Sequence, residues 1–271
     1  MHQRHIVNVK LSDSKEVLAE NIEKIDLKIG DKVVVFIENT YDVGVVSSEE
    51  KIVEESKIDK KNLYKLIRKV NQQDIQRIKE NLQKSQEVLK TIKQVVKNYD
   101  LPIKVVQALY SFDRTKLYVY YTQEKPVNLK KLIHELAHKF KIRIEMKQIG
   151  VRDETKILGG IGVCGYELCC KRWIKKFESI SVEMAKVQQL TLNIPKLSGL
   201  CNRLKCCLFY EYQFYKEAVE KFPKIGGKIK TPDGEGKVIG IDCIKELVTV
   251  ELKTEDGETY TKNFNLSQVG I

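Results

Sequence analysis

The sequence predicts an α+β protein assembled from several small modules. Short runs of β-branched residues, punctuated by Gly, Pro and Asp, occupy both ends of the chain and predict small β-barrels there. Apolar residues at helical spacing open the central part and predict a long helix. Six of the seven cysteines fall between residues 164 and 207. We therefore expect modules over residues 1–60, 61–150, 151–223 and 224–271.

The N-terminal module, residues 1–60, is expected to be a β module of SH3-like size. Residues 29–37 (IGDKVVVFI) predict a strand, and residues 43–46 (VGVV) follow a turn at residues 38–41. Barrels of this size are usually interaction or scaffolding modules, so this prediction says little about function.

The central module, residues 61–150, is expected to contain a three-stranded sheet covered by two helices. Its first helix follows from a seam of apolar residues that Ser85 interrupts: Ile75, Ile78, Leu82, Leu89, Ile92 and Val96. Packing of this helix on a sheet is favoured over a coiled coil. The order αββαβ is completed by strands at 102–109 and 115–122, a helix at 129–140 and a strand at 142–148.

The C-terminal module, residues 224–271, is expected to be a small SH3-like barrel. Its strands are predicted at residues 225–229, 237–241, 247–252 and 259–263, with turns at 232–234 and 256–257. Cys243 stands alone in this module and is interpreted as a small core residue.

Two short motifs match enzyme signatures but are interpreted as structural. Residues 134–138 (HELAH) fit the zinc-binding pattern H-E-x-x-H, yet the apolar residues of this helix lie on the opposite side and turn both histidines to solvent. Residues 160–165 (GIGVCG) fit the dinucleotide pattern G-x-G-x-x-G, but a polar stretch precedes them where a strand is required.

Composition indicates a cytoplasmic protein without membrane insertion. The chain has 271 residues and no apolar run near the ~20 residues that span a bilayer. Its first residues lack the apolar stretch and cleavage site of a signal peptide. Thiols are kept reduced in the cytoplasm, so clustered cysteines favour a metal, a cluster or redox chemistry over structural disulfides.

Positive charge is concentrated in the central module. The net charge is +11, and residues 61–150 alone hold 20 Lys and Arg against 8 Asp and Glu. Such a field favours a polyanion such as RNA, or an acidic protein partner. The alternative is a set of solvated helix faces with no partner.

The same cysteine pattern occurs twice. Residues 164–170 read CGYELCC, and 37 residues later residues 201–207 read CNRLKCC, so both have the form C-x4-C-C. Closed thiolate sites usually take four ligands, and adjacent cysteines point about 100° apart on a helix, so two thiols from each copy are expected to share one site. The candidate metal ligands are Cys164, Cys169, Cys170, Cys201, Cys206 and Cys207.

Glycines around the first copy favour an iron–sulfur cluster over zinc. The run 158–162 (LGGIG) and Gly165 allow backbone N–H groups to approach sulfur atoms closely. Zinc ribbons more often use C-x2-C, which neither copy has. Zinc, a thiol–disulfide switch and plain buried cysteines remain the alternatives.

Basic and aromatic residues follow both copies. Residues 171–177 (KRWIKKF) come after the first copy, and residues 208–215 (LFYEYQFY) come after the second. This composition suits phosphate contact and base stacking, and it equally suits an aromatic core around a metal with lysines outside. The candidate nucleic-acid or partner-binding residues are Lys171, Arg172, Lys175 and Lys176.

Longer motifs surround the cysteines. They are residues 112–114 (FDR), 148–154 (QIGVRDE), 156–162 (KILGGIG), 184–186 (MAK), 189–193 (QLTLN) and 196–208 (KLSGLCNRLKCCL). Through these motifs the chain resembles the bacterial YaaT/RicT family, which carries the conserved C-terminal region of the polymerase-suppressor proteins, here over about residues 62–148. One position departs from the resemblance: Asn202 stands where the second copy in the family usually has Gly.

The resemblance implies a cytoplasmic regulatory subunit that is not an enzyme and has no small-molecule substrate. RicT-like proteins assemble with RicA-like and RicF-like subunits into a complex that carries [4Fe–4S] clusters, and the six candidate cysteines map onto the family's cluster cysteines. That complex is tied to RNase Y and mRNA maturation, and in spore formers to sporulation, competence and biofilm formation. The competing expectation is a nucleic-acid-binding protein with a structural zinc, acting in replication or RNA handling.

Overall fold

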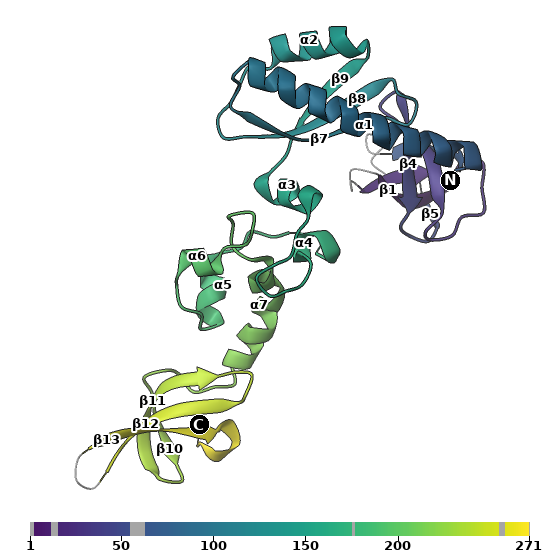
Figure 1. The fold of residues 1–271 in the computed structure, drawn as a ribbon. Helices are drawn as coiled ribbons and strands as arrows, with labels where there is room; N and C mark the ends of the chain where they lie inside the picture. Colours follow the sequence, from purple (N-terminus) through teal and green to yellow (C-terminus); the bar gives the residue numbers. More distant parts are fainter. Residues whose placement is uncertain (1–2, 12–15, 55–62, 175–176, 255–257, 271) are drawn as a thin grey trace. The chain divides into compact units, whose positions relative to one another are not determined.

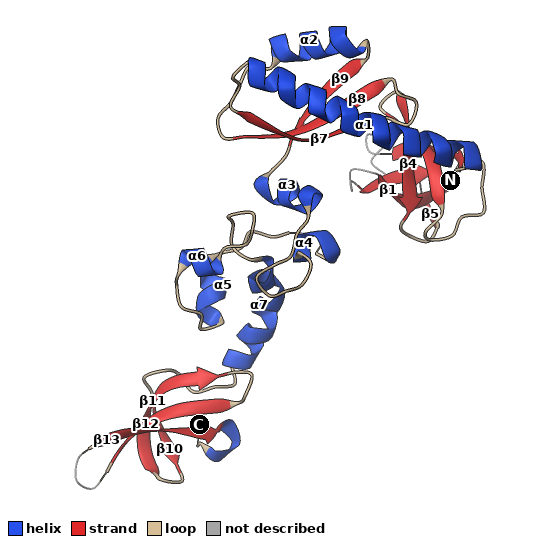
Figure 2. Ribbon diagram, in the orientation of Figure 1, coloured by secondary structure: helices blue, strands red, loops and turns tan. Residues whose placement is uncertain are grey.

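The computed structural model describes residues 3–11, 16–54, 63–174, 177–254 and 258–270, and it confirms the α+β class (Figures 1 and 2). The chain divides into two compact units, residues 1–157 and 158–271, which are described separately below. Within the described ranges, every helix is too short or too polar to cross a membrane.

A closed five-stranded barrel opens the first unit. Its order is β1-β2-β6-β3-β4 and back to β1, and β5 (Lys51–Glu54) pairs with the remaining part of β1. The barrel strands are β1 (Gln3–Leu11), β2 (Glu16–Glu20), β3 (Lys32–Ile37), β4 (Thr40–Val46) and β6 (Leu63–Lys69). Glu38 and Asn39 both have positive φ and form the tight hairpin between β3 and β4, as two-residue turns of right-handed twist require.

Strand β6 corrects the predicted end of the N-terminal module. The sequence boundary lay at residue 60, yet residues 63–69 pair in parallel with β2 and antiparallel with β3. Leu66 is the one fully buried side chain of this strand, and its neighbours are half-buried or exposed. The alternating pattern that identifies a strand is therefore missing from the sequence of β6.

The central module has the predicted order αββαβ. Its sheet order is β7-β8-β9, with β8 and β9 parallel. One core joins the sheet to both helices, through residues such as Ile92, Leu117 and Leu136. The elements are α1 (Gln72–Asn98), β7 (Ile103–Tyr110), β8 (Lys116–Gln123), α2 (Lys130–Phe140) and β9 (Arg143–Gln148). Helix α3 (Val151–Leu158) follows β9.

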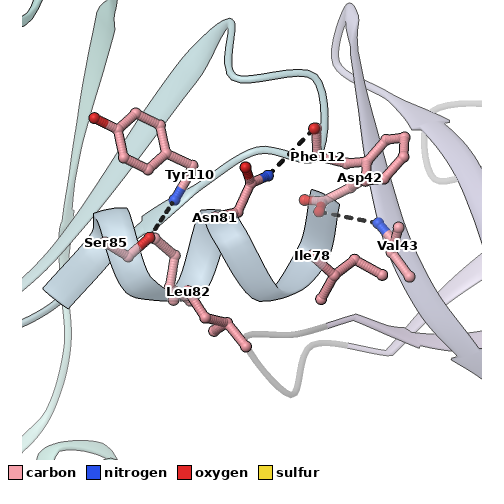
Figure 3. Close-up of a pocket in the computed structure, with 9 residues that line it drawn as sticks. Asp42, Val43, Ile78, Asn81, Leu82, Ser85, Tyr110 and Phe112 are labelled. Atoms are coloured by element: carbon pink, nitrogen blue, oxygen red, sulfur yellow. Dashed lines mark hydrogen bonds between the residues drawn. The ribbon is translucent and has the colours of Figure 1, made fainter. Parts of the chain in front are cut away.

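The first half of α1 packs through polar residues, which corrects the predicted apolar seam. Ile75 and Leu82 are exposed, whereas Asn81 and Ser85 are buried. Asn81 donates from Nδ2 to the carbonyl oxygens of Ser111 (3.2 Å) and Phe112 (3.3 Å), and Ser85 Oγ accepts from the N–H of Tyr110 at 3.2 Å (Figure 3). These side chains satisfy backbone groups at the end of β7, so Ser85 belongs to the packing instead of interrupting it.

The Asp113 carboxylate joins the barrel to the central module. It accepts hydrogen bonds from Thr40 Oγ1 (2.8 Å) and the Tyr41 N–H (3.1 Å) of the barrel, and from Ser111 Oγ (2.7 Å) and the Thr115 N–H (3.1 Å) of its own hairpin. Burial alone would raise the pKa of Asp113, but these hydrogen bonds outweigh it and lower the pKa to about 2.

The second unit combines a helical, cysteine-rich part with a four-stranded antiparallel sheet. The helical part has a small core of Ala185, Leu197 and Leu208. The sheet order is β10-β11-β12-β13, and Gly270 bridges back to Lys230 on its first strand. The elements are α4 (Cys169–Arg172), α5 (Val182–Val187), α6 (Ile194–Leu197), α7 (Cys206–Val219), β10 (Lys228–Thr231), β11 (Gly234–Asp242), β12 (Leu247–Lys253), β13 (Thr259–Asn265) and the 3-10 helix η3 (Leu266–Gln268). Cys243 packs against the core of this sheet, as its interpretation as a core residue requires.

Candidate metal centre

Both cysteine copies fold into the same local unit, which we call a knuckle: residues 160–173 form the first knuckle and residues 197–210 the second. Each begins with a short hairpin, closed by the bridge between Ile161 and Glu167 in one and between Ser198 and Leu204 in the other. The hairpin hydrogen bonds match, because Gly162 N donates to Tyr166 O and Gly199 N to Arg203 O, both at 2.8 Å. The leading cysteine therefore lies in a turn.

The adjacent cysteines occupy the same place in each knuckle, the start of a helix. Cys169 and Cys170 open α4, and Cys206 and Cys207 open α7. The residues before them, Leu168 and Lys205, have nearly identical backbone angles. The repeated sequence is thus a repeated structure.

Asn202 stands where the family usually has Gly, yet it keeps the left-handed backbone conformation of the equivalent Gly165. Gly165 has φ +82° in the first turn, and Asn202 has φ +57° in the second. Both angles lie in the left-handed region, which Asn tolerates better than other residues with a side chain. The departure from the family pattern leaves the turn unchanged.

Glycines leave room beside the turn thiol of the first knuckle. A Cβ at Gly162 would lie 3.2 Å from Cys164 Sγ, and Gly160 has φ +145°, which residues with a side chain rarely adopt. The corresponding approach in the second knuckle, from Gly199 to Cys201 Sγ, is looser at 3.9 Å.

The two knuckles pack against each other. A Cβ at Gly160 would lie 3.3 Å from Leu200 Cδ1, so the second turn covers the first hairpin. Trp173 and Tyr210 meet edge to face with ring centroids 4.2 Å apart. These two rings stand 37 residues apart, so side chains at equivalent positions of the two copies meet at this contact.

This packing brings one thiol from each copy together. The pKa of the Cys207 thiol is raised by burial first, and then by Glu211 and by Cys169 of the other knuckle. Cys170 is buried, Cys164 is exposed, and the other thiols of the set are half-buried. Cys169 thus lies within electrostatic range of Cys207, across the contact between α4 and α7, while Cys164 lies toward solvent.

The donor set fits a thiolate-bound centre by its chemistry. Six thiols in two matching units are soft ligands of the kind that iron–sulfur clusters and structural zinc use. Over the described ranges, however, no three Cys, His, Asp or Glu side chains stand close enough to hold a metal ion. The arrangement shows a pair of thiols across the two knuckles, not a complete ligand set.

The candidate basic residues lie beside this pair. Lys171 and Arg172 are exposed and directly follow Cys170; the Lys171 Nζ lies 3.8 Å from the carboxylate of Glu167. Lys175 and Lys176 lie outside the described residues.

The aromatics that follow the two copies differ in burial: Phe177, Phe209 and Tyr212 are half-buried, whereas Trp173 and Tyr210 are exposed. Trp173 is 41% exposed and Tyr210 is 63% exposed, so this pair lies at the surface. Sequence analysis missed the pairing of the two rings. The signal was available, since each stands three residues after the second cysteine of a Cys-Cys pair.

The rejected enzyme motif is confirmed as a surface feature. His134 and His138 are both exposed on α2 and border a shallow hollow with Tyr99, Lys131 and Glu135. The Tyr99 hydroxyl donates to Glu135, the carboxylate that a zinc protease would use as its base.

Comparison with known proteins agrees with these features. Residues 64–149 match the PSP1 C-terminal conserved region, and residues 179–222 match the third domain of PSP1-like proteins. The stage 0 sporulation protein YaaT of Bacillus subtilis (strain 168) is 40% identical over 190 residues, which cover 70% of this chain and 69% of that protein. No solved structure matches the chain. The chain therefore belongs to the YaaT-like family of PSP1 proteins.

Proposed function

We propose that this protein is a non-enzymatic, cytoplasmic regulatory subunit whose two knuckles hold a [4Fe–4S] cluster. The observation that supports the proposal is the packing of two structurally matching C-x4-C-C units with Cys169 beside Cys207. Two separated segments that present thiols to each other are what a shared inorganic centre requires.

The ligands would come from the six thiols Cys164, Cys169, Cys170, Cys201, Cys206 and Cys207. When bound, the cluster supplies an oxygen- and iron-sensitive link between the knuckles. The chain's own part is to position the thiols: the turns orient the leading cysteines, and the starts of α4 and α7 orient the pairs. Gly162 leaves room beside Cys164.

The proposed process is RNase Y-dependent mRNA maturation and the cell-fate regulation that depends on it. The similar Bacillus subtilis protein is named for sporulation, and this name supports the sporulation part of the proposed role. Partners would be RicA-like and RicF-like subunits and RNase Y itself. The basic central module, with 20 Lys and Arg against 8 Asp and Glu, would contact RNA or an acidic surface of these partners.

Metal analysis of full-length protein purified without oxygen tests the proposal. We expect brown protein that contains iron and sulfide, and loss of most iron in Cys169→Ser and Cys206→Ser, because removing a ligand also removes folding free energy. Cys243→Ser is the matched control and should keep its iron, since Cys243 packs in the C-terminal sheet.

Colourless protein with stoichiometric zinc would contradict the cluster and support the alternative, a nucleic-acid-binding protein with a structural zinc. Full iron content in both knuckle variants would remove these two positions from the ligand set.

A further inference from the structure

We propose that Trp173, Tyr210 and Phe214 form a stacking platform for single-stranded RNA. The inference rests on the proposed role in RNA processing and adds the place where the chain would contact RNA bases. It is carried by the exposure, geometry and charge of the surface beside the knuckle contact.

The three rings form a row on the surface. Trp173 ends α4, Tyr210 meets it edge to face, and Phe214 stands one helical turn beyond Tyr210 on α7. They are 41%, 63% and 61% exposed, which is unusual for three neighbouring large aromatics. Tyr215 also meets Phe214 edge to face, with ring centroids 5.6 Å apart. An edge-to-face contact covers one face of one ring, so the exposed part of the three rings is the area open to a stacking base.

Cations flank the row. Lys171 and Arg172 directly precede Trp173 and are exposed. Arg172 has no ion-pair partner among the residues that the structure describes. Residues 158–223 hold 10 Lys and Arg against 6 Asp and Glu, so this part of the chain is net positive.

Exposed aromatics bordered by exposed cations match the chemistry of single-stranded nucleic acid, although Lys171 also pairs with Glu167 at 3.8 Å. Each base offers a face for stacking, and the backbone offers a phosphate at regular spacing to the neighbouring Lys and Arg side chains. A protein partner would also bury the rings, but an apolar contact makes no use of the exposed Arg172 guanidinium beside them. Charge complementarity therefore favours RNA.

The platform is divided between the two knuckles. Trp173 follows Cys169 by four residues, and Tyr210 follows Cys206 by four residues. Each ring thus lies one helical turn beyond a candidate ligand, and the ring contact exists only while the knuckles are packed together.

The test uses the full-length protein with its metal content measured in the same sample. Trp173 is the single tryptophan of the chain, so its fluorescence reports on this surface alone. We expect a short oligouridine to quench that fluorescence and the affinity to fall steeply with salt, because phosphate contacts release counterions. Duplex RNA of similar charge should bind more weakly, since its bases are already stacked.

Substitutions separate stacking from plain charge attraction. Tyr210→Ala and Phe214→Ala should each weaken oligouridine binding about 5- to 10-fold, while Tyr210→Phe should retain it. Tyr260→Ala is the matched control, because Tyr260 is 39% exposed on β13 of the C-terminal sheet. Arg172→Gln should weaken binding and reduce its salt dependence.

Three outcomes overturn the platform: no quenching at low salt, equal binding of inorganic polyphosphate and oligouridine, or full affinity in the Tyr210→Ala and Phe214→Ala variants. Iron-containing protein that fails to bind RNA would overturn the platform and leave the cluster proposal intact. Protein that binds RNA but contains no iron would contradict the cluster and retain the platform.

Discussion

At the scale of single residues, Asp113 lies in the β7–β8 hairpin where this hairpin meets the barrel. Its carboxylate accepts from both sides of the junction, so its ionised form is stabilised by folding and its pKa falls to about 2. A group whose pKa is lowered contributes stability above its unfolded value of 3.8, and that contribution disappears as the pH falls through about 2.

Asp113→Asn should therefore lower the free energy of unfolding of the first unit by about 1–2 kcal/mol near neutral pH, after discounting for solvent screening. The difference from wild type should shrink as the pH falls below 3.8, because the unfolded chain then binds a proton at this carboxyl before the folded protein does. Urea unfolding followed by hydrogen exchange in β4 and β8 measures it. Asp100→Asn, at the exposed end of α1, is the control; a pH-independent difference for Asp113→Asn would contradict the argument.

A second residue-scale prediction concerns the two knuckle turns. Gly165→Asn and Asn202→Gly should leave metal content and thermal stability nearly unchanged, because both residues adopt the left-handed region that the turn requires. Gly165→Val and Asn202→Val should each destabilise the second unit by about 1–2 kcal/mol. Open space surrounds a Cβ at Gly165, so steric contact cannot explain the loss. Equal stability of the Val variants would show that the turns are not held in this conformation.

At the scale of elements, α1 shows that the spacing of apolar residues predicts a helix better than it predicts which of its side chains are buried. The 3-4 spacing of apolar residues locates the helix, and its second half packs as expected through Ile92 and Val96. Its first half lies against carbonyl groups at the end of β7, which need hydrogen-bond donors, so Asn81 is buried and Leu82 is exposed. Which carbonyls lie beneath a helix is a tertiary property, absent from the spacing of apolar residues.

Two substitutions on adjacent residues of α1 test this. Asn81→Leu should destabilise the first unit by about 1–3 kcal/mol, because the Ser111 and Phe112 carbonyls lose a donor and Arg114 Nε loses an acceptor. Leu82→Gln should change stability by less than about 0.5 kcal/mol, since Leu82 is 52% exposed. Chemical denaturation of both variants gives the comparison. A larger loss of stability in Leu82→Gln than in Asn81→Leu would show that this half of α1 packs through its apolar residues after all.

The residues of the candidate site could be predicted from the sequence, but their arrangement in space could not. The sequence identified all six cysteines and the repeat, because thiols are rare and their spacing is distinctive. It did not show that equivalent rings meet or that Cys169 faces Cys207, since contact between two segments depends on how their hairpins pack. Strand β6 was not predicted for a related reason: it pairs with β2 and β3, but its sequence lacks the alternation of apolar and polar residues that identifies a strand.

At the scale of the whole molecule, the division into two units predicts two stability transitions. The first unit has its own cores in the barrel and the central module, whereas the helical part of the second unit has a small core of three buried residues. We expect removal of iron by a chelator to abolish hydrogen-exchange protection in α7 and leave β1, β3 and β8 protected. Loss of protection in the barrel strands would show that the units unfold together.

The contact between Trp173 and Tyr210 joins two copies of one pattern within a single chain. Because the rings at equivalent positions meet, each copy of C-x4-C-C supplies one half of this contact. Tandem placement in one polypeptide makes that encounter intramolecular and independent of concentration. The two copies also differ at one position: Lys171 is exposed, while its counterpart Leu208 belongs to a small core, so one knuckle faces solvent there and the other is anchored.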